Sequence, residues 1–167
     1  MISNKSSAFC IEKPINTVLE GIRLMIRLTI EMSANASPET IWRIISNVQN
    51  MPRYWYLHRD VKVLEKAGSY LRVLINLALP RPFSREEALV RVSGQELMVM
   101  FNFIKGPLRG KHIIKVNNGN VVSTWSINTS LPLLIFKSWI IQRIRDTTIN
   151  ALTNLINDAV NLNYTDN

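Results

Sequence analysis

The chain has 167 residues, a formal net charge of +8 and one cysteine, Cys10. This length provides one domain with a substantial core and excludes a second domain. A single cysteine excludes an intramolecular disulfide and a cysteine-rich zinc site. No apolar stretch reaches the roughly 18 residues of a membrane-spanning helix, so we expect a soluble protein, and the absence of a signal-like start predicts the cytoplasm.

The basic balance favours contact with something acidic, such as nucleic acid, an anionic membrane, or a carboxylate or phosphate ligand. Charge alone does not choose among these partners, and composition says nothing about oligomeric state.

Residues 1–21 are polar and lack clear periodicity. They predict a loose or disordered N-terminal extension, followed by a single domain at residues 22–163 and a tail at residues 164–167. Residues 27–32 are typical of a first strand. Met25, just ahead of that run, is a second candidate for the initiating methionine.

A helix start follows the first strand. Ser37 can act as the N-cap, Pro38 fits the first helical position, and Glu39 suits the positive end of the helix dipole. Pro52 then ends or bends the helical pattern, so we expect a short second helical turn near it.

Six short apolar runs come next, and segments that contain Gly or Pro separate them. Such runs and turns are typical of consecutive antiparallel strands. The predicted strands are residues 61–65, 70–79, 85–93, 96–105, 111–116 and 121–129. Within residues 70–79 the odd positions are all apolar, whereas Arg72 and Asn76 mark the other face, so the odd set is expected to face inward.

The last predicted element is one long helix, because apolar residues recur at three- and four-residue steps from residue 133 to residue 159. An open sheet with one apolar face needs a cover, and this helix is expected to supply it. Residues 133–141 are apolar nearly all the way round, which exceeds what one contact face requires. Something besides the sheet is therefore expected to lie against them.

This order of elements resembles the START-like, Bet v 1-like (SRPBCC) superfamily, which includes the polyketide cyclase/dehydrase and coenzyme Q-binding families. The local marks are Ala-Ser-Pro-Glu-Thr-Ile-Trp at 36–42, Asn-Val-Gln-Asn-Met-Pro at 47–52, Val-Lys-Val-Leu-Glu at 61–65 and Gly-Pro-Leu-Arg-Gly-Lys-His at 106–112. The resemblance covers roughly residues 26–160. The family usually carries an aromatic residue, commonly Trp, where this chain has His112.

The resemblance implies an α+β helix-grip fold. In this fold a curved antiparallel sheet of about seven strands wraps around a long C-terminal helix, with two short helices after the first strand, and encloses a cavity for an apolar ligand. The residues predicted to line the cavity are Val73, Ile75, Leu77, Val90, Phe101, Phe103, His112, Trp125, Ile127, Phe136, Ile140 and Ile144. His112 and Asn102 would orient a ligand through hydrogen bonds, although an inward His is more often a satisfied structural residue.

Alternate turns of a meander emerge at the same end of the sheet, and one end collects most of the basic turn residues. The turns at this end place Arg81, Lys105, Arg109 and Lys111 in a predicted basic rim. The resembled fold implies that the loop of residues 51–60 adds Arg59 to this rim, together with Arg53 and His58. Such a rim suits an amphiphile with an anionic head or an acidic docking surface, and an ordinary solvated surface stays the alternative.

We therefore expect the chain to bind or transport a small hydrophobic or amphiphilic ligand, such as a lipid, quinone or polyketide-like molecule. One alternative is a polyketide cyclase or dehydratase with His112 as acid or base. Another, by analogy with START-like ribosome-association toxins, is docking on RNA or the ribosome, although the strands lack the aromatic and basic interleaving of an RNA-binding sheet. The chain has two histidines and no common catalytic or metal-binding motif, so neither a metal nor a cofactor is expected.

Overall fold

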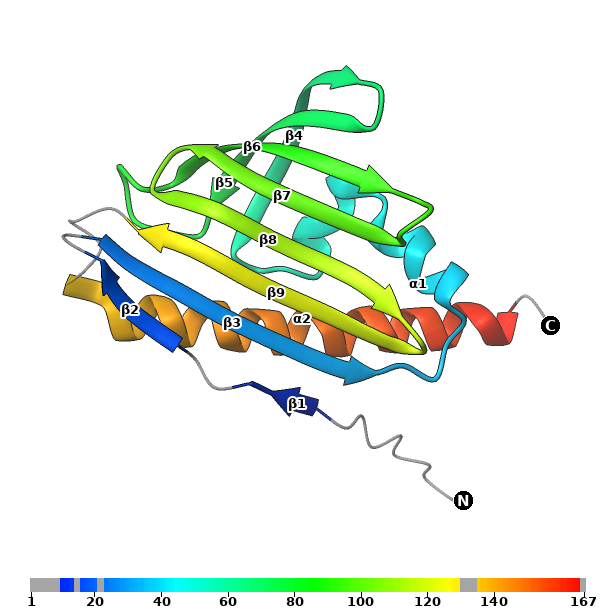
Figure 1. Cartoon of the computed structure of the whole chain (residues 1–167). Coiled ribbons are helices and arrows are strands. Elements are labelled where there is room, and N and C mark those ends of the chain that lie inside the picture. The colour runs from blue at the N-terminus through cyan, green and yellow to red at the C-terminus, as the bar shows by residue number, and fades with distance from the viewer. Residues whose placement is uncertain (1–9, 14–15, 21–22, 130–134, 166–167) are drawn as a thin grey trace.

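The computed structural model describes residues 10–13, 16–20, 23–129 and 135–165. In this part of the chain the strands form one curved antiparallel sheet, and a long helix, α2 (Lys137–Thr165), runs across its concave face (Figure 1). This is the α+β helix-grip architecture that the sequence predicts.

The predicted meander is confirmed. Its strands are β4 (His58–Ala67), β5 (Tyr70–Leu77), β6 (Arg85–Ser93), β7 (Met98–Lys105), β8 (Leu108–Asn117) and β9 (Asn120–Thr129), and each pairs with the next. Strand β3 (Arg23–Ser33) pairs with β9, which brings Leu28 opposite Trp125. Both β4 and β8 begin earlier than the sequence predicts: β8 includes Arg109 and Gly110, which were expected in a turn because of the glycine, and β4 starts at His58 beside a register shift.

Two N-terminal segments extend the sheet. Strands β1 (Cys10–Glu12) and β2 (Asn16–Glu20) both pair antiparallel with β3. These segments belong to the sheet and do not form the loose extension that their polar composition predicts. Pairing at a sheet edge uses backbone N–H and C=O groups, which leave no mark in a side-chain pattern. Residues 1–9 of that predicted extension lie outside the described residues.

Helix α1 (Pro38–Ile45) begins where the sequence predicts. The Ser37 hydroxyl accepts a hydrogen bond from the backbone N–H of Thr40, with nitrogen and oxygen 3.1 Å apart, and Ser37 has the extended backbone of an N-cap. A short 3-10 helix, η1 (Val48–Arg53), follows and contains Pro52. This is the predicted second helical turn.

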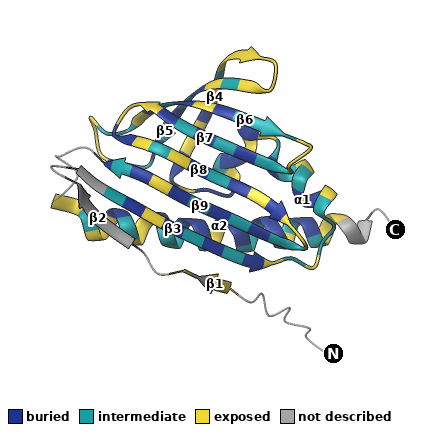
Figure 2. Ribbon diagram, viewed as in Figure 1, coloured by how far each residue is buried: buried dark blue, intermediate teal, exposed yellow. Residues whose placement is uncertain are grey.

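The core lies between the sheet and α2 (Figure 2). The buried face of α2 contains the predicted stripe residues Ile140, Ile144, Thr148, Leu152, Leu155 and Ala159, together with Thr147, Ala151 and Ile156. One hydrogen bond ties the two layers together, because the indole N–H of Trp125 on β9 donates to the Thr148 hydroxyl over 3.0 Å. No helix in the described part of the chain is long and apolar enough to cross a membrane.

Candidate functional site

The inner face of the sheet brings together almost all of the predicted lining residues. Eleven of the twelve are buried: Val73, Ile75, Leu77, Val90, Phe101, Phe103, His112, Trp125, Ile127, Ile140 and Ile144. The exception is Phe136, whose side chain is 54% exposed. Phe136 precedes α2 and faces solvent, because the first turns of that helix are apolar on more sides than the sheet covers. Asn102 lies opposite Leu89 and Lys111 on the outer face, so it does not point toward the interior as expected.

Aromatic rings fill the centre of this interior. The imidazole of His112 stacks on the indole of Trp125, with ring centroids 3.6 Å apart and planes 9° apart. The ring of Phe101 stacks at 5.9 Å from that of His112, and Trp55 meets His112 edge-on at 5.7 Å. The interior is therefore closely packed around the polar ring of His112.

His112 is fully buried. Its Nε2 atom lies 2.9 Å from the Ser123 hydroxyl, whereas Nδ1 has no hydrogen-bond partner. Burial, and to a smaller extent the proximity of His58, hold the pKa of His112 well below its usual range. The ring is accordingly neutral at physiological pH, with one nitrogen able to donate and the other able to accept a hydrogen bond.

His58 is the residue whose position differs most from the expectation. We expected it at the basic rim, but it is the first residue of β4, only 2% exposed, and its ring lies 5.9 Å from that of Phe101. A register shift between His58 and Asp60 in the pairing with β5 breaks the simple alternation and turns His58 inward. Neither ring nitrogen has a hydrogen-bond partner, and burial lowers the pKa of His58 to about 4.

Unpartnered polar atoms gather along this inner face. In the described residues, the buried side-chain atoms without a hydrogen bond are Trp55 Nε1, His58 Nδ1 and Nε2, Glu86 Oε1, His112 Nδ1 and Thr129 Oγ1. Each such group costs about 1–3 kcal/mol of stability when it is buried without a partner. Their concentration on one apolar face indicates hydrogen-bonding capacity that the protein does not use internally.

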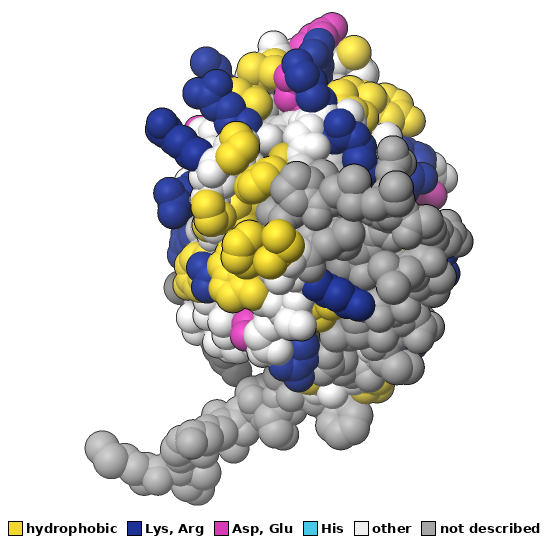
Figure 3. Space-filling view, turned by 90° about the vertical axis from the view of Figure 1, so that its left-hand side faces the viewer, with side chains coloured by type: hydrophobic (Ala, Val, Ile, Leu, Met, Phe, Trp, Pro, Cys, Tyr) yellow, Lys and Arg dark blue, Asp and Glu magenta, His cyan; other side chains and the backbone are white. Residues whose placement is uncertain are grey.

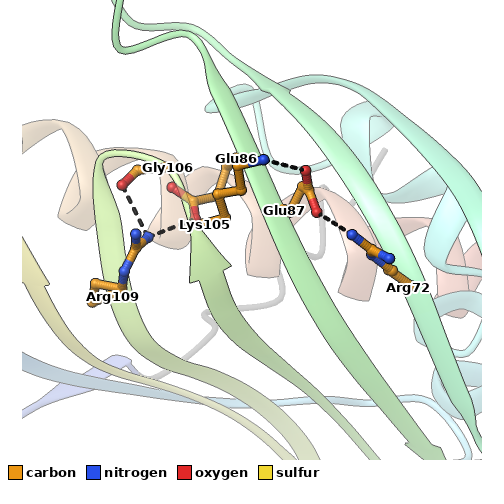
Figure 4. A network of polar contacts seen from close by, with 6 residues as sticks. All are labelled: Arg72, Glu86, Glu87, Lys105, Gly106 and Arg109. Atoms are coloured by element: carbon orange, nitrogen blue, oxygen red, sulfur yellow. Dashed lines mark hydrogen bonds and ion pairs between the residues drawn. The ribbon is translucent and has the colours of Figure 1, made fainter.

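Glu86 contributes a buried carboxyl at the end of the sheet where α2 begins (Figure 1), and it lies beside Gly106 and Arg109 (Figure 4). Its Oε2 accepts a hydrogen bond from the backbone N–H of Leu108 over 2.9 Å, and its Oε1 lies 3.9 Å from Nη1 of Arg109. Arg109 also donates to the carbonyls of Gly106 and Leu108. Burial outweighs these contacts and raises the pKa of Glu86 to about 8, so the carboxyl is protonated at neutral pH.

The turn between β7 and β8 depends on this carboxyl and on Gly106. The backbone φ of Gly106 is +143°, and a Cβ there would lie 2.5 Å from Glu86 Oε2 and 2.6 Å from the Arg85 carbonyl oxygen. Only glycine fits such a close approach. Glu86 therefore fixes the turn that carries Leu108.

A small apolar opening lies beside Leu108. It has a volume of about 10 Å³ and is lined by Leu57, Leu79, Leu108, Trp139, Ile140, Arg143 and Ile144. This volume corresponds to about one water molecule and is too small for an organic ligand. In this conformation, α2 therefore closes the opening between the sheet and the loop of Leu57.

The predicted basic rim is divided in the structure. Arg59, Arg81 and Arg85 line one surface hollow of about 700 Å³, beside Asp60 and Asn76. Lys105 instead pairs with Glu87 over 3.6 Å, Arg109 lies near Glu86, and Lys111 is exposed on the outer face of β8.

Arg53 lies away from this end. It pairs with Asp158 near the C-terminal end of α2 over 2.8 Å, where Tyr54 also donates a hydrogen bond to Asp158. Arg53, Tyr54 and Asp158 all line a separate hollow of about 380 Å³ between η1 and α2. Residues 51–60 therefore connect two regions along α2: Arg53 lies near its C-terminal end, whereas Leu57 lines the apolar opening near its start.

The sequence did not indicate Trp55 or Thr129 as site candidates, and it placed His58 at the rim rather than on the inner face. Thr129 continues the alternation of Val121, Ser123 and Trp125, so its inward direction could have been predicted. Trp55 and His58 carry no such signal, because one lies in a loop and the other lies beside the register shift. No group of three or more His, Cys, Asp or Glu side chains in the described ranges is placed to hold a metal ion.

Comparison with known proteins agrees with this architecture. Residues 34–114, slightly less than half of the chain, match the family described as "Polyketide cyclase / dehydrase and lipid transport". No curated protein sequence matches the chain.

Several solved structures are similar. TTHA0849 from Thermus thermophilus shares 14% identity over 81% of this chain and 98% of that chain, with a TM-score of 0.66. The ZhuI aromatase/cyclase from Streptomyces sp. R1128 shares 8% over 81% and 93%, with a TM-score of 0.65. A STAR-related lipid transfer protein fragment from Xanthomonas axonopodis shares 9% over 84% and 98%, with a TM-score of 0.53. The resemblance to START-like proteins, and with it the helix-grip fold, is confirmed.

Proposed function

We propose that this chain, which has the START-like helix-grip fold, binds a small hydrophobic molecule that carries hydrogen-bonding oxygen atoms. A quinone or a polyketide-like compound fits this description. The observation that carries the proposal is the set of unpartnered polar atoms in the otherwise apolar interior, contributed by the inner face of the sheet and by Trp55 in the loop before β4. The matched family, described by both polyketide cyclase/dehydrase and lipid transport, supports an apolar ligand.

The chemistry of these atoms limits the ligand. Trp55 Nε1 can only donate a hydrogen bond, so it requires a carbonyl, ether or hydroxyl oxygen. Neutral His58 and the Thr129 hydroxyl can each donate and accept. A ligand with several oxygens on a flat apolar frame would meet these groups and stack on the rings of Phe101 and Trp125. A pure hydrocarbon would leave every one of them unpaired.

Binding in this interior requires movement. The opening of about 10 Å³ beside Leu108 admits no ligand, and the interior rings are in contact. The first turns of α2 are the part that must swing outward, because Trp139, Ile140 and Ile144 form one wall of the opening. Arg109 and the arginines near Leu79 would then stand at the basic rim of the opened site, where an anionic group of the ligand can lie.

Binding is favoured over catalysis. A cyclase that used His112 as acid or base would need one of its ring nitrogens to reach the substrate. Nε2 of His112 lies against the Ser123 hydroxyl and the ring stacks on Trp125, so Nδ1 is the nitrogen left to contact a ligand, and in this neutral ring it serves as a hydrogen-bonding atom rather than as a proton carrier. The pKa of His112 is also far below the value near 7 that suits general acid–base catalysis.

The proposal can be tested with naphthoquinone and naphthalene, which share a ring frame and differ in two carbonyl oxygens. We expect naphthoquinone to bind up to about tenfold more tightly for each hydrogen bond gained. NMR spectra should show a shift of the Trp55 indole N–H signal, assigned with the Trp55→Phe variant, and no shift for Trp42, whose indole lies beside Gly94 beyond the far end of β6. His58→Leu should weaken naphthoquinone binding and leave naphthalene binding unchanged.

Thr153→Val is the matched control, because Thr153 bonds only to the Ile149 carbonyl within α2 and lies off the inner face. Equal affinity for naphthoquinone and naphthalene would overturn the proposal that the buried polar atoms form hydrogen bonds to the ligand. Failure of both probes to bind, together with no small molecule in native mass spectra of protein from its own host, would overturn the hydrophobic-ligand function itself.

A further inference from the structure

The beginning of α2 exposes large apolar side chains. Ile135 is 85% exposed, Phe136 is 54% exposed and Trp139 is 47% exposed. These residues lie within one and a half helical turns of each other, and we call them the apolar tip. Three large side chains that stay together in water without cover are typical of an interaction surface, whereas single exposed apolar residues are ordinary.

Positive charge adjoins the apolar tip. Trp139 and Leu79 line the same small opening, and Leu79 also lines the hollow that contains Arg59, Arg81 and Arg85. We call these three residues the arginine hollow. Figure 3 shows this end of the molecule, with hydrophobic side chains in the centre and Lys and Arg side chains around them. The tip and the hollow thus form one continuous surface.

The charges of the arginine hollow are largely uncompensated. In the described part of the chain, none of its three arginines forms an ion pair, whereas Lys105 pairs with Glu87 and Arg109 lies near Glu86. The acidic residue at the hollow is Asp60, which accepts a hydrogen bond from Asn76 over 3.4 Å. Three guanidinium groups therefore face solvent with one carboxylate beside them.

We propose that this end of the molecule docks on an anionic phospholipid bilayer. Phe136 and Trp139 would insert at the level of the headgroups, where aromatic side chains are favoured, and the arginine hollow would contact lipid phosphates. A bilayer meets both parts of this surface, since its phosphates can contact the arginines while its headgroup region takes up exposed aromatic side chains. This inference stands on the surface alone and does not require the proposed interior ligand.

Co-sedimentation with vesicles tests the docking. The full chain should bind vesicles in which a third of the lipid is phosphatidylglycerol and bind poorly to phosphatidylcholine alone. Replacing Arg59, Arg81 and Arg85 with Gln should weaken binding about a hundredfold, because each basic residue near an anionic surface contributes about a factor of five. The control replaces Lys62, Lys66 and Lys115 with Gln, which removes the same charge from exposed positions outside the proposed surface.

The apolar tip is tested separately with Phe136→Ser and Trp139→Ser. Both side chains are about half exposed, so the variants should fold, and circular dichroism checks this. We expect each variant to bind anionic vesicles at least tenfold less tightly, and brominated lipid should quench Trp139 fluorescence in the unmodified chain.

Three outcomes would overturn the docking surface. The first is an equal loss in the lysine control, which would indicate attraction by net charge alone. The second is vesicle binding that the tip variants leave unchanged, which would indicate that the arginines attract lipid headgroups without any insertion of the apolar tip. The third is the absence of any binding to anionic vesicles. Naphthoquinone binding by the tip variants is measured in parallel, so failure of docking is distinguishable from failure of the interior site.

Discussion

The backbone N–H of Leu108 donates a hydrogen bond to the buried carboxyl of Glu86, with nitrogen and oxygen 2.9 Å apart. This bond joins the start of β6 to the turn that precedes β8 and sets the position of Leu108 at the apolar opening. Because burial raises the pKa of Glu86 to about 8, the state of this bond depends on pH in a range where few other groups titrate.

The first prediction concerns stability between pH 6.5 and 8. In this range Glu86 is protonated in the folded chain and ionised in the unfolded chain, so unfolding releases a proton. The free energy of unfolding should fall as the pH rises, by up to about 1.4 kcal/mol per pH unit, and level off above pH 8. Urea denaturation at several pH values measures this slope. Glu86→Gln should flatten it, because the amide stays neutral.

Glu87→Gln is the matched control for this slope. Glu87 pairs with Arg72 over 2.9 Å, and this pairing lowers the pKa of Glu87, so it stays ionised in both states throughout the range. Its replacement should leave the slope unchanged. A Glu86→Gln variant that keeps the slope of the original chain would contradict the prediction.

The second prediction concerns the acidic side. Burial lowers the pKa of His58 to about 4. Below pH 6.5, His58 is therefore protonated in the unfolded chain but stays neutral in the folded chain until the pH reaches about 4. His58 therefore makes the free energy of unfolding fall as the pH decreases from 6.5 to about 4. His58→Leu should remove up to about 1.4 kcal/mol per pH unit of this loss. Urea denaturation at several pH values compares the original chain with His58→Leu. The difference between their free energies of unfolding should vary below pH 6.5 and be constant above pH 7. A difference that is constant at every pH would contradict the predicted role of His58.

The third prediction concerns the hydrogen bond between the sheet and α2. Thr148→Val keeps the shape of the side chain but leaves the indole N–H of Trp125 buried without an acceptor. This should lower the free energy of unfolding by about 1–3 kcal/mol, measured by chemical denaturation. Thr153→Val replaces a partly buried threonine that bonds only within the helix, and it should cost much less. Equal losses would mean that the Trp125 bond contributes nothing specific.

The fourth prediction concerns Gly106. An alanine there combines a φ of +143° with a Cβ that lies 2.5 Å from the Glu86 carboxyl, so Gly106→Ala should lower the free energy of unfolding by more than about 2 kcal/mol. Gly119 also has a positive φ, +78°, but nothing lies within 4 Å of its would-be Cβ. Gly119→Ala should therefore cost only about 1 kcal/mol. Thermal denaturation compares the two, and similar losses would show that the contact with Glu86 is unimportant.

Many elements of this fold could be predicted from the sequence, because their positions follow from patterns of apolar and polar side chains. Ser37 and Pro38 mark the start of α1, the odd positions of β5 face inward as predicted, and the stripe from Ile140 to Ala159 is the buried face of α2. In each case the preference comes from local backbone chemistry or from a regular period, and the tertiary structure preserves it.

The positions that the sequence did not predict have three separate causes. His58 turns inward at a register shift, which moves side chains to the opposite face without any change in composition. Strands β1 and β2 join the sheet by antiparallel pairing with β3, which uses backbone groups that no side-chain pattern reveals. Phe136 belongs to an apolar segment with no polar side, so its pattern could not indicate which side chains would face water.

The pairing of β3 with β9 has a consequence for the way the chain reaches this structure. Leu28 finds its partner Trp125 only after almost the entire domain has been synthesised, and α2, which covers the inner face, comes later still. Contacts between such distant segments slow folding, because the loop between them must close before the pairing is gained. A nascent chain on the ribosome would therefore display the apolar face of the meander for most of its synthesis, and we expect it to depend on chaperones.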